Sequence, residues 1–352
     1  MDRWFILSCI SAIVGSLWSL SVKYGLEYFT PKTFACWYSS IMALIIGIVV
    51  YVKTKSLKIT KWGIGSGIGA GIASILLAMS FGESPNPGFS MAIFRMQAIL
   101  TAIMSYFVFG APLSPAKVLG MIVSIAGVIV ISTSHANHKK IKHSNDKHDK
   151  DKTNAKDPNQ EHKSESSFSE YKWIFLALGA GIMMTFKDIL TKKGLTDNGP
   201  KIMHSLMWST AVFQVVALFI TLFITKGNVK LQEKTILPHY DKTSLFHIVL
   251  AGTAFAAYQF MVITACKEAP NVGIVKAIDT LGIVVTAAAS YYLFGSNINT
   301  DSIIGMFLVV GGVMSMQCEV PFCALPPLKS KFHKDLDKGK IEAAFASLSY
   351  GS

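Results

Sequence analysis

The chain has 352 residues, of which 51% are hydrophobic and only 15% are charged. A soluble domain carries about 25% charged residues, so this composition excludes the ordinary water-soluble class and indicates a membrane protein. The formal net charge of +12 does not indicate nucleic acid binding, because the lysines lie mainly between and beyond the apolar segments, as in membrane proteins.

Ten apolar segments follow one another along the sequence, each close to the roughly 20 residues that a membrane-spanning helix needs. Lipid offers no hydrogen-bond partner to backbone N–H and C=O groups, so each segment is expected to be an α-helix. The first contains Trp4 and Trp18 and follows no strongly basic stretch, which favours an uncleaved span over a signal peptide. The segments cover 4–22, 34–52, 63–81, 88–109, 115–132, 172–191, 203–225, 244–265, 273–294 and 302–320.

Two hydrophilic segments lie outside these spans. Residues 133–170 contain almost no large apolar side chain and mix both charge signs, a composition that predicts a disordered linker. Residues 321–352 begin with prolines and then become basic, so we expect an exposed tail. Counting Lys and Arg in the short loops and the tail gives 15 on one side and 6 on the other. This asymmetry predicts that both termini are cytosolic, in the plasma membrane or an organelle membrane.

The two halves of the chain repeat one another. Residues 83–128, which begin ESPNPG, align with 268–313, which begin EAPNVG, at 16 identical positions of 46 and an offset of 185. Upstream, KYGLEYFTPK (23–32) matches KKGLTDNGPK (192–201) at five of ten positions and an offset of 169. We therefore predict two five-helix halves, 1–132 and 171–320. Because five is odd, the second half is expected to run in the opposite direction, and such inverted pairs are common in secondary transporters.

The residues of the repeated turn are suited to ending one helix and beginning the next. Asn86 is expected to cap the following helix with Pro87 at its first position, and Asn271 is the natural cap in the second copy. Glu83 and Glu268 begin the two copies of the turn. The favoured interpretation of each is a hydrogen-bonded carboxylate near the membrane surface, with cation contact or the closing of a gate as the alternative.

The run RMQAILTAIMSYFVFGAPLSPAKVLGMIVSIAGVIVI (95–131) resembles the signature half of an EamA-type transporter of the drug/metabolite transporter superfamily. Its counterpart at 279–315 fits the same pattern less closely. The resemblance implies an all-α integral membrane protein with ten transmembrane helices as two inverted five-helix repeats, a central cavity, and movement of small organic solutes. It does not specify the solute. The family usually has Glu after the Phe-Gly or Leu-Gly that ends the fourth helix, where this chain has Ala111 and Ser296.

Ionisable side chains inside spans are candidates for function, because each costs several kcal/mol unless it is paired or hydrated. The offset of 185 places Asp279 opposite Phe94, beside the counterpart of Arg95, so a buried Arg95–Asp279 pair is geometrically possible. Participation of this pair in substrate or proton binding is favoured over a purely helix-locking role. The ionisable residues are Arg95 in the fourth span, Lys187 and Asp188 in the sixth, and Lys276 and Asp279 in the ninth.

Polar and aromatic side chains add to this candidate site. Tyr258 and Gln259 are the best hydrogen-bonding candidates in the eighth span, and Trp18 aligns with Lys187 at the offset of 169. Three basic residues against two acidic ones hint at an anionic or zwitterionic substrate. The predicted substrate-binding set is Arg95, Asp279, Lys276, Tyr258, Gln259, Trp18 and Lys187.

The leading hypothesis is a secondary transporter that moves a small organic metabolite by alternating access, with proton coupling or exchange left open. It would act as a monomer or homodimer in the lipid bilayer, with no nucleic acid partner. The alternatives are a transporter of Mg²⁺ or another divalent cation, and a non-transporting scaffold. An enzyme is disfavoured, because the sequence has no nucleophile–base arrangement, phosphate loop or HExxH motif. Its five cysteines form no CxxC motif, so we predict no cofactor and no metal site.

Overall fold

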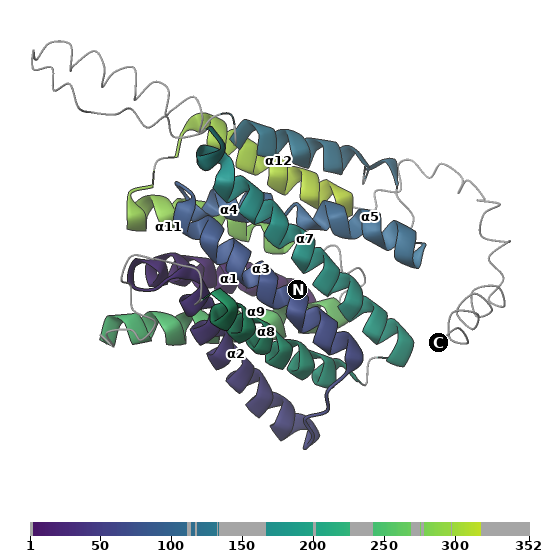
Figure 1. Ribbon diagram of the computed structural model, residues 1–352. Coiled ribbons are helices and arrows are strands. Elements are labelled where there is room, and N and C mark those ends of the chain that lie inside the picture. Colours follow the sequence, from purple (N-terminus) through teal and green to yellow (C-terminus); the bar gives the residue numbers. More distant parts are fainter. Residues whose placement is uncertain are drawn as a thin grey trace, which may run out of the picture. The chain divides into compact units, whose positions relative to one another are not determined.

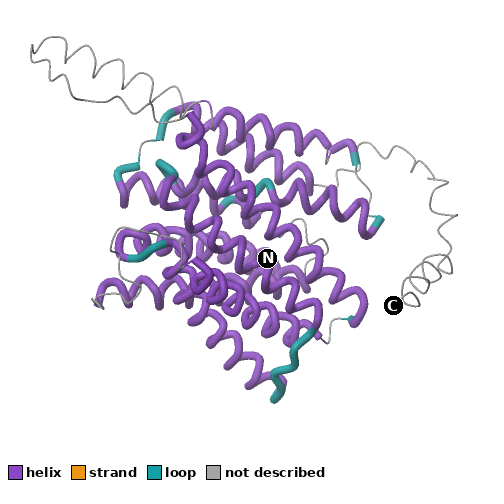
Figure 2. The backbone as a smooth tube through the Cα atoms, viewed as in Figure 1, coloured by secondary structure: helices purple, strands orange, loops and turns teal. Residues whose placement is uncertain are grey.

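The computed structural model describes residues 3–110, 114–116, 118–131, 133, 167–199, 202–225, 242–268, 275, 278–296 and 298–317. In this part of the chain every regular element is a helix (Figures 1 and 2). A short helix also covers Val118–Ile131. The labelled helices are α1 (Arg3–Tyr28), α2 (Pro31–Thr54), α3 (Lys61–Glu83), α4 (Pro87–Phe94), α5 (Gln97–Phe109), α7 (Ser167–Asn198), α8 (Met203–Thr225), α9 (Lys242–Glu268), α11 (Gly282–Phe294) and α12 (Thr300–Gln317).

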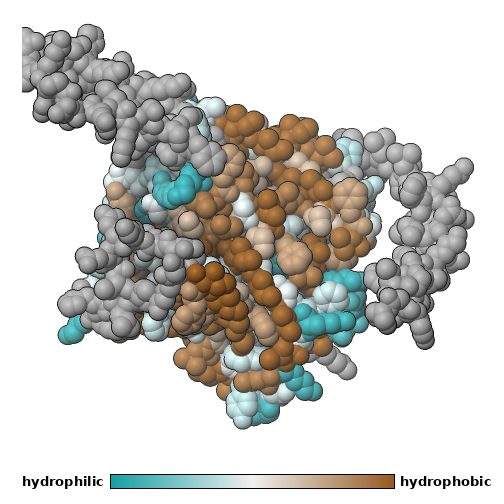
Figure 3. All heavy atoms as spheres, viewed as in Figure 1, coloured by the Kyte–Doolittle hydropathy of each residue, from teal (hydrophilic) through white to brown (hydrophobic). Residues whose placement is uncertain are grey.

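The helices have the length and the surface of membrane spans. Seven are long and apolar enough to cross a bilayer, counting α4 and α5 together as Pro87–Phe109, and three more apolar helices are shorter. Large apolar side chains point outward, including Phe107 at 76% exposure and Tyr292 at 82%. Figure 3 shows such side chains over much of the visible face. An apolar surface of this extent needs lipid contact, so the chain is a multi-pass integral membrane protein.

Two spans extend well beyond the segments that the hydropathy pattern predicts. Helix α1 continues to Tyr28 rather than ending at 22, and the Lys23 ammonium donates to the Phe81 carbonyl at 2.7 Å. Helix α7 begins at Ser167, inside the predicted linker, and ends at Asn198 instead of 191. The remaining linker positions, 134–166, and the tail at 321–352 lie outside the described residues.

The fourth span was predicted as one continuous helix, and this is wrong. The structure breaks it at Arg95 and Met96, between α4 and α5. The Met96 N–H donates to the Ile93 carbonyl at 3.0 Å and the Ile99 N–H to the Met96 carbonyl at 2.9 Å. These bonds join residues three apart, the tighter pattern that marks a local departure from the α-helix.

The ninth span breaks in the same way at the equivalent position. The Leu281 N–H donates to the Ile278 carbonyl at 3.0 Å and the Val284 N–H to the Leu281 carbonyl at 3.1 Å. All four of these residues lie 185 positions after their counterparts at the first break. Helices α5 and α11 both have 13 residues, and both end at a left-handed glycine, Gly110 (φ 63°) and Gly295 (φ 59°). The repeat therefore extends from side chains to backbone hydrogen bonds.

Helices of one half pack mainly against helices of the other. Helix α1 packs on α9 and α7 on α3, while α2 also packs on α9 and α3 on α8. Helices α4 and α11 approach so closely at Gly88 that a Cβ atom there would lie 2.5 Å from the Cβ of Ala287. Small residues at such crossings let membrane helices come together without clashes. This interlocking buries Arg95 and Asp279, which lie beside the two breaks.

The first copy of the repeated turn adopts the predicted geometry. The Asn86 side chain accepts from the Gly88 N–H at 2.7 Å, and Pro87 occupies the first turn of α4. The cap predicted at Asn271 lies outside the described residues.

Candidate functional site

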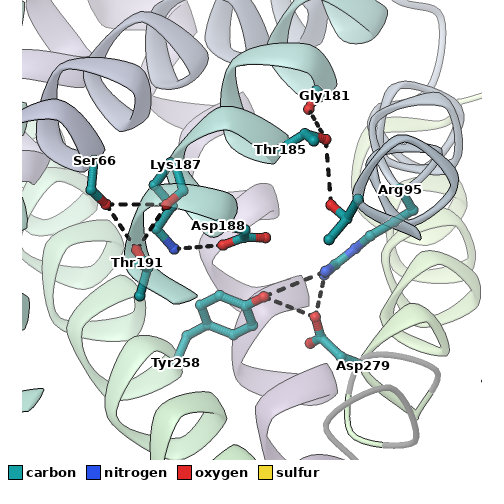
Figure 4. Close-up of polar contacts among 10 residues, drawn as sticks. Ser66, Arg95, Gly181, Thr185, Lys187, Asp188, Thr191, Tyr258 and Asp279 are labelled. Carbon is teal, nitrogen blue, oxygen red and sulfur yellow. Dashed lines mark hydrogen bonds and ion pairs between the residues drawn. The ribbon is translucent and has the colours of Figure 1, made fainter. Parts of the chain in front are cut away.

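Arg95, Asp279 and Tyr258 form a buried polar cluster (Figure 4). The Arg95 guanidinium is paired with the Asp279 carboxylate, and these two side chains are 5% and 0% exposed. The Tyr258 hydroxyl donates to the same carboxylate oxygen, Oδ2, at 2.8 Å. Arg95 Nη1 lies 3.4 Å from the Tyr258 hydroxyl oxygen, to which it donates. The ion pair that the sequence allowed is thus present, with a phenol completing it.

The two helix breaks and α9 bring these three residues together. Arg95 is the residue at which α4 ends, and Asp279 lies in the short helical turn before the second break at Leu281. Tyr258 projects from α9, the long helix that packs on α1. Each charge therefore sits at a helix discontinuity, the kind of feature that builds midplane substrate and ion sites in inverted-repeat membrane proteins.

Several polar atoms around the breaks are buried without a protein partner in the described part of the chain. They are Nε of Arg95, Oδ1 of Asp279 and Oε1 of Gln97, the first residue of α5. Buried polar groups are normally hydrogen-bonded, and exceptions call for an explanation. One donor and two acceptors without a hydrogen-bond partner make the surroundings of the breaks a candidate place for binding a polar solute or water.

A second charged pair lies on α7. The Lys187 ammonium is 3.2 Å from Asp188 Oδ1, with side-chain exposures of 14% and 20%. On the same helix, the Thr185 hydroxyl donates to the Gln97 carbonyl at 3.2 Å. Because residues three apart share a helix face, Asp188 lies on the side of α7 that meets the first break. Figure 4 shows this pair in the same region as the Arg95 cluster.

The predicted excess of positive charge is not present among the described residues. Arg95 pairs with Asp279 and Lys187 with Asp188, so these four intramembrane charges balance. The excess rested on Lys276, which lies outside the described residues. The predicted excess therefore stays a prediction. Within the described ranges, no three His, Cys, Asp or Glu residues are grouped so that they could hold a metal ion.

Trp18 and Gln259 lie near the cluster but do not complete it. Trp18 is 5% exposed and stacks on Phe255 with ring centroids 4.6 Å apart, and Phe255 stacks in turn on Tyr258 at 6.2 Å. Trp18 thus supports the Tyr258 ring through Phe255. Gln259 is half-buried, and because successive helical residues are about 100° apart, it points away from the direction of Tyr258.

Sequence reasoning missed Ser16 and Thr185, which brace the two breaks. Ser16 Oγ lies 2.9 Å from the Gly282 carbonyl oxygen and 2.8 Å from that of Ala12. Thr185 Oγ1 lies 3.2 Å from the Gln97 carbonyl oxygen and 3.0 Å from that of Gly181. Each hydroxyl is shared between its own helix and the first carbonyl of α11 or α5. Ser16 and Thr185 are related by the offset of 169, which was the one signal that pointed to them.

Comparison with known proteins decides the family. The model of the EamA-like transporter family matches residues 2–133 and 171–317. The chain belongs to this family. As an EamA-like protein, within the drug/metabolite transporter superfamily, it is a membrane transporter of small molecules.

Comparisons of this EamA-like protein with curated proteins and with solved structures gave different results. No curated protein matches the sequence. A crystal structure of another protein matches with a TM-score of 0.56 and 13% sequence identity, covering 90% of this chain and 97% of that one. At that identity the likeness shows a shared fold.

Proposed function

We propose that this EamA-like protein is a secondary transporter that moves a small organic solute by alternating access, with Arg95, Asp279 and Tyr258 at its binding centre. The observation that carries the proposal is the buried ion pair at the breaks of two repeat-related spans. Burying two charges costs several kcal/mol per ion before pairing. A helix-locking contact could be replaced by apolar packing at no loss, whereas a solute site needs these charges.

The proposal includes ten transmembrane helices arranged as two inverted repeats. The direction of α1 and α7, which correspond at the offset of 169, supports it. The C-terminal part of α1 meets the end of α3, because Lys23 bonds to the Phe81 carbonyl. The N-terminal part of α7 meets the same end of α3, because Lys172 pairs with Glu83. Equivalent helices therefore run in opposite directions, as inversion requires.

The Arg95–Asp279 pair suits a zwitterionic solute, with an anionic solute as the alternative. Arg95 offers a partner for a carboxylate, and Asp279 offers one for an ammonium group. A solute that carries both groups exchanges one internal ion pair for two solute contacts and leaves no buried charge unpaired. Proton coupling fits the same pair, since protonation of Asp279 would release Arg95. We further propose cytosolic termini, following the distribution of lysines and arginines.

Uptake into proteoliposomes tests the function. Purified protein is assayed with a panel of amino acids, sugar phosphates, nucleotide sugars and Mg²⁺, and the assay is repeated with Arg95→Ala and Asp279→Asn. Lys193→Ala is the control, because Lys193 pairs with Asp197 on the same helix. We expect an organic solute to move, both site variants to lose most of the flux, and the control to keep it. Mg²⁺ flux without any organic solute would overturn the function, and full flux in both site variants would overturn the centre.

A further inference from the structure

We propose that two exposed ion pairs, Arg3–Glu268 and Lys172–Glu83, are the gates at the two ends of the transport pathway. We refer to them as the end pairs. The inference rests on the proposed alternating access, and it assigns to the repeated Glu-x-Pro-Asn-x-Gly turn a role that the binding centre leaves unexplained.

The two end pairs are the same contact made twice. Arg3 Nη1 lies 3.2 Å from Glu268 Oε1, and Lys172 Nζ lies 2.6 Å from Glu83 Oε1. The two glutamates are 185 positions apart and the two basic residues are 169 apart, the offsets of the repeat. Each pair joins the beginning of the first helix of one half to the last turn of the third helix of the other half. Each therefore ties the two halves together.

The end pairs lie at opposite ends of α1. Arg3 begins this unbroken helix, and Lys23, which is 20 residues further on, bonds to Phe81 in the last turns of α3. At 1.5 Å per residue the two positions are about 30 Å apart, the thickness of the hydrocarbon core. Glu83 ends α3, so the Lys172–Glu83 pair lies at the Lys23 end of α1 and the Arg3–Glu268 pair at the other.

The strength of the end pairs suits a contact that must open in every cycle. Their side chains are 31–76% exposed in one pair and 36–47% in the other. Ion pairs with such access to water contribute little, because solvent screens them and ordering two long side chains costs entropy. Both are formed together in the structure. When one half rocks against the other, one end pair has to part while its equivalent stays closed.

The test measures the opening of each end with spin labels, independently of any solute. Two label pairs related by the same offsets report the two ends: Ile6 with Thr264 on α1 and α9, and Phe175 with Met79 on α7 and α3. Each position is changed to cysteine in a full-length background whose five native cysteines are alanine. Arg3→Met and Lys172→Met then remove one end pair each and keep the apolar stem. Lys193→Met is the matched control. The Lys193 and Asp197 side chains are 45% and 34% exposed, close to the values in the end pairs, but both lie on α7, so their ion pair does not join the two halves.

We expect opposite shifts in the two variants. Arg3→Met should raise the open fraction at the Ile6–Thr264 end about 2- to 5-fold, the change that corresponds to loss of one exposed ion pair, and lower it at the other end. Lys172→Met should do the reverse, and Lys193→Met should do neither. Exchanging the charges in Arg3→Glu with Glu268→Arg should restore the original distances, which separates loss of the pair from misfolding.

Distances that stay unchanged, or that move in the same direction in both variants, would overturn the end pairs as gates. The proposed function fails separately. If the distances shift in opposite directions but no solute in the uptake panel moves, coupling of the two ends stands and solute transport does not. If a solute moves and the distances do not shift as expected, transport stands and the gate assignment fails.

Discussion

Ser16 and Thr185 make equivalent hydrogen bonds in the two halves of the molecule. Ser16 lies within bonding distance of the Gly282 carbonyl and Thr185 within bonding distance of the Gln97 carbonyl, at 2.9 and 3.2 Å. These carbonyls belong to the first residues after the two helix breaks. A break removes regular helical bonds from buried backbone, and lipid cannot replace them. The two hydroxyls therefore supply hydrogen bonds that offset part of the cost of the breaks inside the membrane.

Removing either hydroxyl should destabilise the protein by about 1 kcal/mol, the usual contribution of one buried hydrogen bond. We expect Ser16→Ala and Thr185→Val to lower the thermal unfolding temperature in detergent by similar amounts. Ser21→Ala is the control, because the Ser21 hydroxyl bonds to the Leu17 carbonyl of its own helix. If Ser21→Ala lowers the unfolding temperature as much as the two variants do, the hydrogen bonds to the breaks contribute no more to stability than a hydrogen bond within one helix.

Breaking the buried ion pair from one side should be costly. Arg95→Met leaves the Asp279 charge buried without its partner, and Asp279→Leu does the same to Arg95, so each should destabilise by about 3–5 kcal/mol. The double variant removes both charges and should cost much less than the sum. Denaturant unfolding of all four proteins measures this coupling. Additive losses would mean that the two charges do not depend on one another.

The Tyr258 hydroxyl should contribute to stability and transport independently of the Tyr258 ring. Tyr258→Phe removes the 2.8 Å hydrogen bond to Asp279 while the ring still stacks on Phe255. Because the acceptor is charged, we expect a loss of about 1.5–3 kcal/mol and a reduced transport rate. Phe255→Leu is the converse control, since it removes the stacking and keeps the hydroxyl. If Tyr258→Phe transports at the original rate, the hydroxyl is not part of the binding centre.

The crossing of α4 and α11 should tolerate no side chain at Gly88. A Cβ atom there would lie 2.5 Å from Ala287 Cβ and 2.7 Å from its Cα, so Gly88→Ala must push two helices apart. Overpacking of this kind costs about 1–3 kcal/mol. At Gly311 of α12 a Cβ atom would meet nothing within 4 Å, so Gly311→Ala should be neutral or gain up to about 1 kcal/mol through helix propensity. Equal unfolding temperatures for the two variants would contradict the tight crossing.

Sequence patterns predicted much of the molecule, because lipid leaves few structural choices. A long apolar run in a membrane has to be a helix, so hydropathy located the spans, and the offset of 185 brought Arg95 beside the counterpart of Asp279. The breaks at Met96 and Leu281 were not predicted, because no proline lies in either span to mark the position at which the helix is interrupted. Hydropathy measures how apolar a segment is. It does not indicate which backbone carbonyl will accept a hydrogen bond from a hydroxyl on another helix.

The amino-acid sequence by itself determined the membrane class, the EamA-like family, the duplication and the small set of intramembrane charges. The class, the duplication and the charges follow from composition or self-similarity, and the family follows from likeness to known sequences. All of these are properties of the chain in any conformation. Only the tertiary structure decided which of these charges meet, that Tyr258 joins them, and that Ser16 and Thr185 brace the breaks. It also decided that the glutamates of the repeated turn pair with Arg3 and Lys172. Apart from the Tyr258–Asp279 contact within the second half, these contacts join residues 88 or more positions apart in different halves, and only the packing of one half against the other brings them within bonding distance.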